Sequence, residues 1–446
     1  MALSDLAALT AAEAAKRIRT GEITSEELAR ACLDAIAARE DEIGAWTYLD
    51  PDYALNQARE ADEIRRQGRE VGPLHGVPVG IKDIIETEDM PTENGCPIFD
   101  GRRAGRDAAV VAGLREAGAV IMGKTVTTEM AVYYPGKTRN PHRPTHTPGG
   151  SSSGSAAAVA ANMVPLSVGT QTNGSVVRPA SFCGVYGLKP TYGLFSRRNV
   201  LVQSPPLDTV GVFARSIEDL AIAADVLSTY DEADSAMWRR SRGSHHKVAM
   251  EEPPVPPVLG FVKRPVWDQA SSVTQDAFGE LAEELGAHCE EVELPLPFEG
   301  VIQMHADIML PDIARHFGPL EEKYPDKLSA RLRDMIEQGR RVSAVAYNHA
   351  RDQQQILYRV LESYFDRYLA LLTPSAPGPA PEGIDTTGNP VFCTMWTFFG
   401  TPAMSLPLLE ADGLPLGVQL VGPRRDDARL LRTARWLVGH LAESAA

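Results

Sequence analysis

Two short segments rich in serine and glycine hold the residues best suited to chemistry. Residues 147–155 read TPGGSSSGS, and residues 169–178 read GTQTNGSVVR. A serine in such a segment is either a turn residue or a nucleophile, and a nucleophilic serine needs a base to take its proton. Ser175 lacks the GxSxG pattern and has no histidine near it in sequence. The glycines and small side chains favour free backbone N–H groups, which can hold a developing negative charge.

A possible base lies in the apolar run at residues 76–85. Lys82 interrupts this run, GVPVGIKDII, where a lysine is unexpected unless it is paired or functional. Burial lowers the pKa of a lysine and favours the neutral amine, which is the form that accepts a proton. The alternative is a structural lysine that points to solvent or bridges to Asp83. The local sequence leaves both hypotheses open.

Other chemical patterns fail when their context is considered. Residues 118–125, GAVIMGKT, match the phosphate-loop pattern. A helical window precedes them and residues 119–122 look like a buried strand, which is the wrong order for a phosphate loop. His142 and His146 stand four apart, but in a proline-rich segment that disfavours a helix. HExxH and paired Cys or His spacings are missing from the sequence, and we therefore expect neither a metal nor a cofactor.

The elements that must position these residues alternate between helix and strand. Residues 1–71 look helical, and Thr10 with Glu13 and Thr24 with Glu27 match the capping box that begins a helix. From residue 72 onward, short β-rich runs alternate with helical windows, which indicates strands connected by helices. The β-rich runs are 77–85, 119–122 and 164–168, and the helical windows include 107–117 and 216–227.

The rest of the chain continues this pattern after one interruption. Residues 231–257 carry charge and proline without a period and predict a surface excursion. Helical and strand-like windows resume over residues 258–446, at 273–285, 347–371, 416–421 and 428–441. We therefore expect one α/β domain over residues 1–446.

Composition restricts the partners and the compartment. The formal net charge is -15, which disfavours nucleic acid and anionic membranes because they select clustered Lys and Arg. The sequence contains no apolar run long enough for a membrane span and does not begin like a signal peptide. Five scattered cysteines without CxxC indicate reduced thiols, and we expect a cytoplasmic protein.

Taken together, the motifs resemble those of the amidase signature hydrolases. The resemblance implies an α/β fold with a central mixed β-sheet covered on both faces by α-helices, and a signature core at residues 72–215. The matching segments are 74–83, 118–125, 147–155, 169–175 and 183–191, followed by 400–407 and 413–422 toward the C-terminus.

The resemblance also implies a Ser-Ser-Lys triad. It assigns Ser175 as nucleophile, Ser151 as bridging serine after a cis peptide bond to Gly150, and Lys82 as base. Backbone N–H groups of Thr172, Asn173, Gly174 and Ser175 would form the oxyanion hole. The implied activity is hydrolysis of a small amide or carbamate (urethane) through an acyl-enzyme, without a cofactor.

The chain departs from the family pattern in several places near the site, and we expect Arg178, Met130 and Gln171 to bind substrate. Asn173 stands where many relatives keep glycine, Gln171 stands where aspartate is common, and the segment around Met130 differs from the usual one. Arg178 lies three residues after Ser175, as in malonamidase-like members, which suggests binding of a substrate carboxylate. The alternative for Arg178 is a structural pair with Asp208 or another acid.

Two alternatives to a general amide or carbamate hydrolase remain. One is an amidase for malonamate-type acids that uses Arg178. The other is the amidase-like subunit of a tRNA-dependent amidotransferase, which works only inside a complex. The expected partner is a small-molecule substrate, with a homodimer left open and neither nucleic acid nor membrane expected.

Overall fold

The structure is a computed structural model that describes residues 3–239 and 243–444. One 11-stranded sheet runs through it in the order β1-β3-β2-β4-β6-β5-β10-β11-β9-β7-β8. The strands are β1 (Trp46–Leu49), β2 (Pro78–Lys82), β3 (Val120–Thr125), β4 (Leu166–Gln171), β5 (Tyr186–Lys189), β6 (Thr209–Ala214), β7 (Leu259–Val262), β8 (Cys289–Val292), β9 (Ala370–Pro374), β10 (Ala403–Ala411) and β11 (Leu414–Val421). Parallel and antiparallel pairs both occur, and the sheet is therefore mixed.

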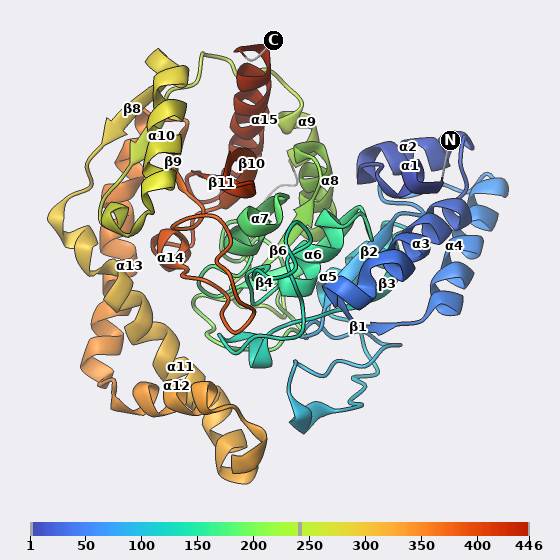
Figure 1. Cartoon of the computed structure of the whole chain (residues 1–446), viewed down its shortest axis with the longest axis horizontal. Helices are drawn as coiled ribbons and strands as arrows, with labels where there is room; N and C mark the ends of the chain where they lie inside the picture. Colours follow the sequence, from blue (N-terminus) through green and yellow to red (C-terminus); the bar gives the residue numbers. More distant parts are fainter. Residues whose placement is uncertain (1–2, 240–242, 445–446) are drawn as a thin grey trace.

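Helices flank the sheet on both faces, as the sequence predicts (Figure 1). The N-terminal helices lie at one end of the molecule, and the helices over residues 272–362 lie at the other. The α-helices are α1 (Leu3–Ala7), α2 (Ala11–Thr20), α3 (Ser25–Ile43), α4 (Pro51–Arg66), α5 (Ala109–Glu116), α6 (Ser153–Ala160), α7 (Val177–Cys183), α8 (Ile217–Leu227), α9 (His245–Ala249), α10 (Ser272–Leu285), α11 (Val301–Lys323), α12 (Ala330–Arg341), α13 (Ala344–Glu362), α14 (Val391–Phe398) and α15 (Asp427–Ser444).

Local signals in the sequence place several of these elements correctly. Both expected capping boxes are present, at the first residues of α2 and α3. The apolar runs become β2, β3 and β4, and every residue of these three strands is buried. Residues 118–125 turn into strand β3 rather than opening a helix, which agrees with rejecting a phosphate loop.

The central strands explain why distant segments meet. Strand β2 pairs in parallel with both β3 and β4, and neighbouring parallel strands end at the same edge of a sheet. Lys82 is the last residue of β2, and Gln171 is the last residue of β4. The segment that follows β4 therefore begins beside Lys82.

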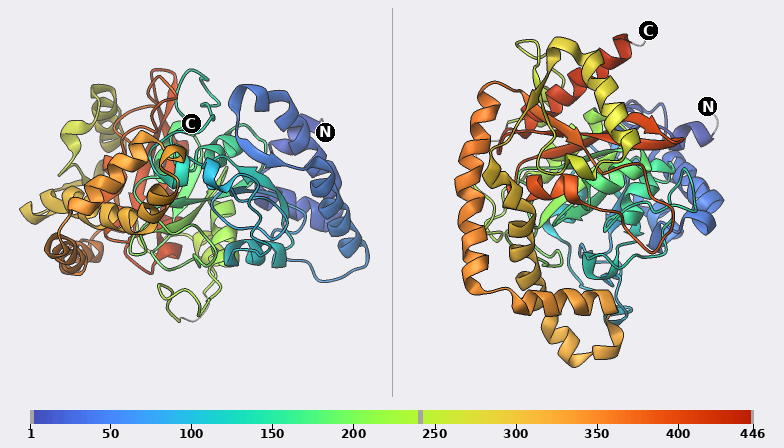
Figure 2. Two further views of the ribbon diagram at one scale, coloured as in Figure 1. Left: turned by 90° about the horizontal axis from the view of Figure 1, so that it is seen from below. Right: turned by 60° about the vertical axis from the view of Figure 1, so that its left-hand side comes forward.

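Helices α11, α12 and α13 form an arm that extends from the body of the molecule, on the side opposite the N-terminal helices (Figures 1 and 2). The sequence periodicity does not predict α11 or α12. Pro311 and Pro319 lie inside α11, and proline is a strong signal against a helix interior. Tertiary packing overrides that signal here, because one side of α11 is buried against α12, α13 and α14.

The expected surface excursion at residues 231–257 is more structured than its sequence suggests. It includes the short helix α9, which contacts α8 and α15. Asp234 is buried and forms an ion pair of 2.8 Å with Arg197. Residues 240–242 of this segment lie outside the described residues.

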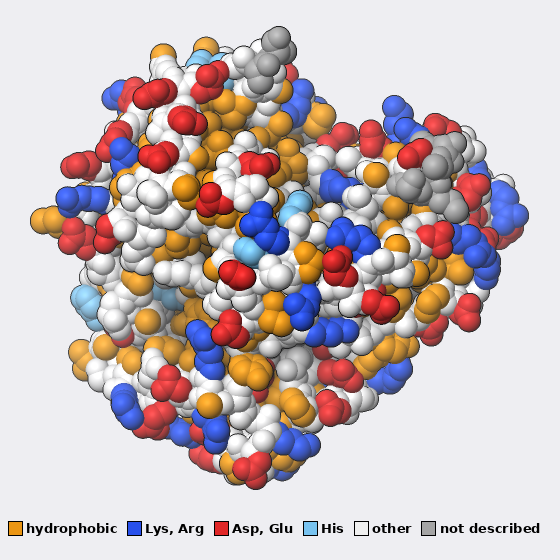
Figure 3. All heavy atoms as spheres, in the orientation of Figure 1, with side chains coloured by type: hydrophobic (Ala, Val, Ile, Leu, Met, Phe, Trp, Pro, Cys, Tyr) orange, Lys and Arg blue, Asp and Glu red, His pale blue; other side chains and the backbone are white. Residues whose placement is uncertain are grey.

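The surface carries charges of both signs. Acidic and basic side chains are interspersed over the face seen in Figure 3. Among the helices that the structure describes, none is long and apolar enough to cross a membrane.

Candidate active site

Lys82 and Ser151 come together in the interior. The Lys82 Nζ lies 2.7 Å from the Ser151 Oγ and 2.7 Å from the Thr170 Oγ1. Lys82 is fully buried, and Ser151 is 2% exposed. The peptide bond between Gly150 and Ser151 is cis, as the resemblance implies. The buried lysine amine is thus held between two hydroxyl groups.

The electrostatic setting of Lys82 favours its neutral form. Burial holds the pKa of Lys82 well below its ordinary value, and the negative charge of Asp208 opposes this shift only in part. Asp83, the alternative partner, instead lies 3.7 Å from the Nζ of Lys124. Neither the solvent-exposed nor the Asp83-bridged arrangement of Lys82 is therefore present.

Ser175 lies in the loop between β4 and α7, and this loop exposes a row of N–H groups. Within the described residues, the N–H groups of residues 172–175 donate to no protein acceptor. The carbonyl oxygens of residues 172–174 do have donors: His305 Nε2 at 2.9 Å, Thr397 Oγ1 at 2.5 Å and the Arg178 N at 3.0 Å, respectively. A trans peptide points its carbonyl and its N–H in opposite directions. The bonded carbonyls therefore turn the N–H groups of residues 173–175 the other way.

Two side chains hold Thr172 at the start of this loop. His305 of α11 is 1% exposed, and burial lowers its pKa to about 4. The ring is therefore neutral at pH 7, and its Nε2–H donates to the Thr172 carbonyl. On the other side, the Thr172 hydroxyl donates to Asp208 at 2.6 Å. Sequence periodicity does not identify His305, because it does not predict the helix that carries this residue.

The side chain of Asn173 holds the loop in place through two hydrogen bonds. The Asn173 amide donates to the Tyr133 hydroxyl at 2.8 Å and accepts from the Thr394 hydroxyl at 2.7 Å. Its φ is not in the left-handed region that would favour glycine. Asparagine thus replaces glycine here without backbone strain.

Gln171 does not reach toward a ligand. Its side-chain oxygen accepts from the N–H groups of Val176 and Val177 at 2.8 and 3.0 Å, and its nitrogen donates to Thr397 at 2.9 Å. Gln171 is fully buried, and its amide is occupied at both ends. This placement argues against the substrate-binding role expected for it and makes it part of the loop's scaffold.

Arg178 is buried without an acidic partner. Its Nη2 donates to the Gly150 carbonyl at 2.6 Å and to the Thr387 hydroxyl at 3.2 Å. Its Nε and Nη1 have no hydrogen-bond partner in the described part of the chain, and no carboxylate there forms an ion pair with it. Asp208 accepts from Thr172 and from backbone N–H groups instead. The alternative of a structural pair between Arg178 and Asp208 is therefore wrong.

The bond from Arg178 also joins the two serine segments. It connects the carbonyl of Gly150 to the first turn of α7, three residues after Ser175. Gly149 lies so close to the same turn that a Cβ on it would come within 2.8 Å of the Pro179 Cα. The chain around Ser151 therefore packs directly on the turn that follows Ser175.

Met130, the remaining residue expected to bind substrate, is 1% exposed. It belongs to the hydrophobic cluster that also contains Leu207 and Trp396. Its φ of 48° lies in the left-handed region, as does the 59° of Ala131. Two such residues in succession are uncommon in non-glycine backbone.

Metal-binding geometry is missing from the described residues: no three His, Cys, Asp or Glu side chains among them gather as a set of ligands. Lys124, the lysine of the phosphate-loop pattern, donates to the carbonyl oxygens of Ile85 and Pro91 and to the Thr92 hydroxyl. These three hydrogen bonds occupy the Lys124 amine inside the protein.

Comparisons with known proteins identify the family of the chain. The family model described as Amidase matches residues 27–431. A glutamyl-tRNA(Gln) amidotransferase subunit of Chloroflexus aurantiacus is 34% identical to the chain, with 96% of each chain covered.

Solved structures share the whole fold. A chain from a vestigial protein complex, connected with the evolutionary origins of an s-triazine catabolic enzyme, superposes with a TM-score of 0.91 at 27% identity, over 97% of this chain and 98% of that one. A peptide amidase in complex with the competitive inhibitor chymostatin superposes with a TM-score of 0.84 at 31% identity, over 97% of each. The chain therefore belongs to the amidase signature family of enzymes that act on C–N bonds.

Proposed function

We propose that this chain hydrolyses the C–N bond of a small amide or carbamate through an acyl-enzyme on Ser175. The observation that carries the proposal is the fully buried Lys82 amine held 2.7 Å from the Ser151 hydroxyl. A buried, neutral lysine accepts a proton, whereas a charged one cannot.

In the proposed mechanism the proton moves along a short relay. Lys82 Nζ takes the Ser151 proton while the Ser151 oxygen takes that of Ser175, whose Oγ attacks the substrate carbonyl carbon. The relay then returns a proton to the leaving nitrogen as the C–N bond breaks. Water attacks the resulting ester with the same base, and Ser175 is regenerated.

The loop after β4 would stabilise the negative charge that develops on the carbonyl oxygen. Within the described part of the chain, its N–H groups at residues 172–175 have no protein acceptor. The carbonyl oxygens of residues 172–174 each accept a hydrogen bond. Such preorganisation matters because the donors need not reorient during the reaction.

Substitution of the nucleophile tests this mechanism. We expect Ser175→Ala to lower turnover by about 10⁴-fold or more and to abolish covalent labelling by a sulfonyl fluoride. Ser153→Ala is the control, because Ser153 is a buried serine of the other serine-rich segment, 147–155, and its hydroxyl makes only a long bond of 3.4 Å to a carbonyl. Retained labelling of Ser175→Ala at this site would contradict the assignment.

The pH profile tests the base. The pKa of Lys82 is lowered, and only the amine that has lost its proton can act as base. The rate of the wild-type chain should therefore rise with pH and level off above the Lys82 pKa. A rate that is highest at acidic pH would argue against lysine.

The curated relatives favour a second function more strongly than they favour a carbamate substrate. The Chloroflexus aurantiacus relative, which is 34% identical over 96% of each chain, is an amidotransferase subunit. In that case the same triad would release ammonia from an amide donor within a complex. Hydrolysis of small amides by the purified chain alone supports an autonomous enzyme, whereas turnover that needs the other proteins of an amidotransferase supports the second function.

Arg178 supports a narrower version of the hydrolase. Two of its guanidinium nitrogens are buried without partners in the described residues, and the planar guanidinium matches a carboxylate well. A substrate carboxylate, as in malonamate, would supply the missing acceptors. We expect Arg178→Ala to reduce kcat/KM for malonamate by at least about 10-fold relative to a neutral amide of similar size, since a charged hydrogen bond contributes about 1.5–3 kcal/mol. An unchanged ratio between the two substrates would rule out this role.

A further inference from the structure

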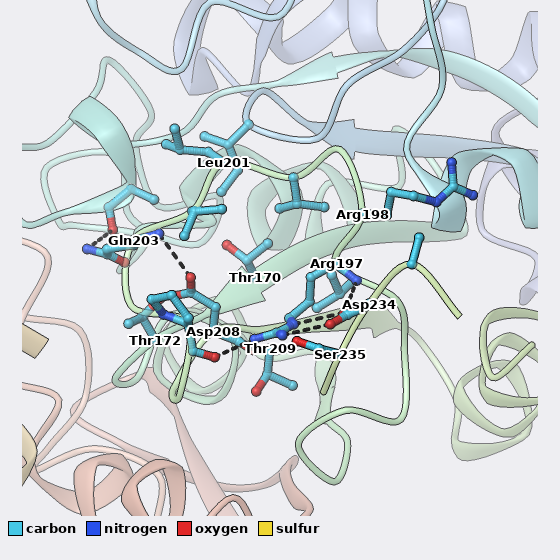
Figure 4. Close-up of a pocket in the computed structure, with 17 residues that line it drawn as sticks. Thr170, Thr172, Arg197, Arg198, Leu201, Gln203, Asp208, Thr209, Asp234 and Ser235 are labelled. Carbon is cyan, nitrogen blue, oxygen red and sulfur yellow. Dashed lines mark hydrogen bonds and ion pairs between the residues drawn. The ribbon is translucent and has the colours of Figure 1, made fainter. Parts of the chain in front are cut away.

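A cavity of about 200 Å³ lies directly beside the candidate base (Figure 4). Thr170 and Thr172 line it from the end of β4. Thr170 is also the residue whose hydroxyl lies 2.7 Å from the Lys82 amine, and Thr172 begins the loop that leads to Ser175. Thr170 therefore belongs both to the wall of the cavity and to the hydrogen bonds of the lysine amine.

The wall of this cavity is mainly apolar. The apolar residues that line it are Ile84, Ala131, Val200, Leu201, Val202, Pro205, Val210 and Ala233. These side chains favour an uncharged group over a charged one, because burial of an unpaired charge is costly.

The charged residues of the wall are already engaged. Arg197 and Asp234 form an ion pair with each other at 2.8 Å, visible as dashed lines in Figure 4. Asp208 accepts from the Thr172 hydroxyl and from the N–H groups of Gln203 and Ser204. Neither carboxylate is left to bind a cationic ligand.

The direction of proton transfer decides which part of a substrate would face this cavity. The substrate carbonyl oxygen must point to the N–H groups of the loop, and the leaving nitrogen must receive its proton from the Lys82–Ser151 relay. The leaving nitrogen therefore lies beside Ser151, and its substituent extends from that side of the site. Thr170, on that side, opens onto the cavity.

We propose that this cavity is the leaving-group subsite and that it takes an uncharged aromatic or branched aliphatic substituent on the scissile nitrogen. The preferred substrates are then N-aryl or N-alkyl amides and carbamates rather than primary amides. The volume of about 200 Å³ supports this choice, because a molecule of the size of water or ammonia occupies only about 30 Å³. The proposal rests on the hydrolase function proposed above.

Two substrates that share an acyl group isolate the leaving-group side. Acetamide and acetanilide form the same acyl-enzyme, and their difference in kcat/KM therefore arises before that intermediate. Malonamate and malonanilate form a second such pair for an enzyme that requires a carboxylate.

Two substitutions fill the cavity from different walls. Ala233→Trp acts at an exposed residue of the lining, where a large side chain does not disturb the core. Leu201→Trp acts from within the cavity. We expect each to lower kcat/KM for the anilide by at least 10-fold and to change that for the primary amide by less than twofold. Glu232→Trp is the matched control, because Glu232 is the exposed neighbour of Ala233 and does not line the cavity.

The outcomes separate this inference from the proposed function. Wild-type preference for the primary amide, or an equal effect of Ala233→Trp on both substrates, overturns the leaving-group subsite while leaving the hydrolase intact. Failure of the wild type to hydrolyse any of the substrates overturns the hydrolase itself. Ligand-observed NMR with aniline and Ser175→Ala then tests the cavity without turnover: aniline binding that Ala233→Trp removes supports the subsite, and absence of binding refutes it.

Discussion

Single residues far from Ser175 in sequence hold the loop that carries it. His305 is the most informative of them, because it is buried, neutral and bonded to the Thr172 carbonyl at 2.9 Å. It touches no reacting atom in the proposed mechanism. We therefore regard it as a positioning residue that sets the direction of the neighbouring N–H groups.

Removal of the His305 donor should slow the reaction without weakening substrate binding. We expect His305→Ala to lower kcat by about 10- to 100-fold with little change in KM, because misdirected N–H groups affect the transition state more than the bound substrate. His305→Gln, which keeps an N–H donor, should recover part of kcat. Steady-state kinetics and thermal unfolding of both variants provide the measurement. A fall in the unfolding temperature with normal kcat would show a purely structural role.

At the scale of elements, helix α6 positions Ser151 through one close approach. The helix begins at Ser153, two residues after Ser151. A Cβ on Gly154 would come within 2.2 Å of the Ala45 carbonyl oxygen and 2.4 Å of the Val126 nitrogen. Both are backbone atoms and cannot move aside easily, and glycine is therefore required for α6 to lie against β3 and Ser151 to reach Lys82.

Addition of one methyl group at this position should disturb both stability and activity. We expect Gly154→Ala to lower the free energy of unfolding by about 2 kcal/mol or more, in the range seen for overpacking, and to reduce turnover by displacing Ser151. Gly113→Ala in α5 is the control, because its Cβ would meet only the Val226 carbonyl oxygen at 3.5 Å, an ordinary contact. That substitution should be neutral or stabilising, since alanine favours a helix. Equal behaviour of the two variants in thermal unfolding would contradict this account.

At the scale of the whole molecule, the site is assembled from most of the chain. Strand β2 supplies Lys82, the start of α6 follows Ser151, and the β4–α7 loop holds Ser175. The helical arm contributes His305, and α14 contributes Thr394 and Thr397. The candidate active site therefore draws on elements that span residues 82–397 of the chain.

Much of this arrangement could be predicted from local sequence, because local sequence encodes burial, capping and turns. The capping boxes, the central strands and the unusual lysine in an apolar run are all visible without coordinates. So are the serine and glycine segments. The order of these motifs predicts the family, which the comparisons confirm.

Only the tertiary structure decided what each of these side chains meets. It shows that Lys82 contacts Ser151 and Thr170 rather than Asp83, that Gln171 is enclosed by its own loop, and that Arg178 lacks an acid among the described residues. The cavity beside Thr170 also belongs to this group, since several separate segments form its wall. Such contacts join residues tens to hundreds of positions apart, and their geometry depends on strand order and helix packing, which no local pattern encodes.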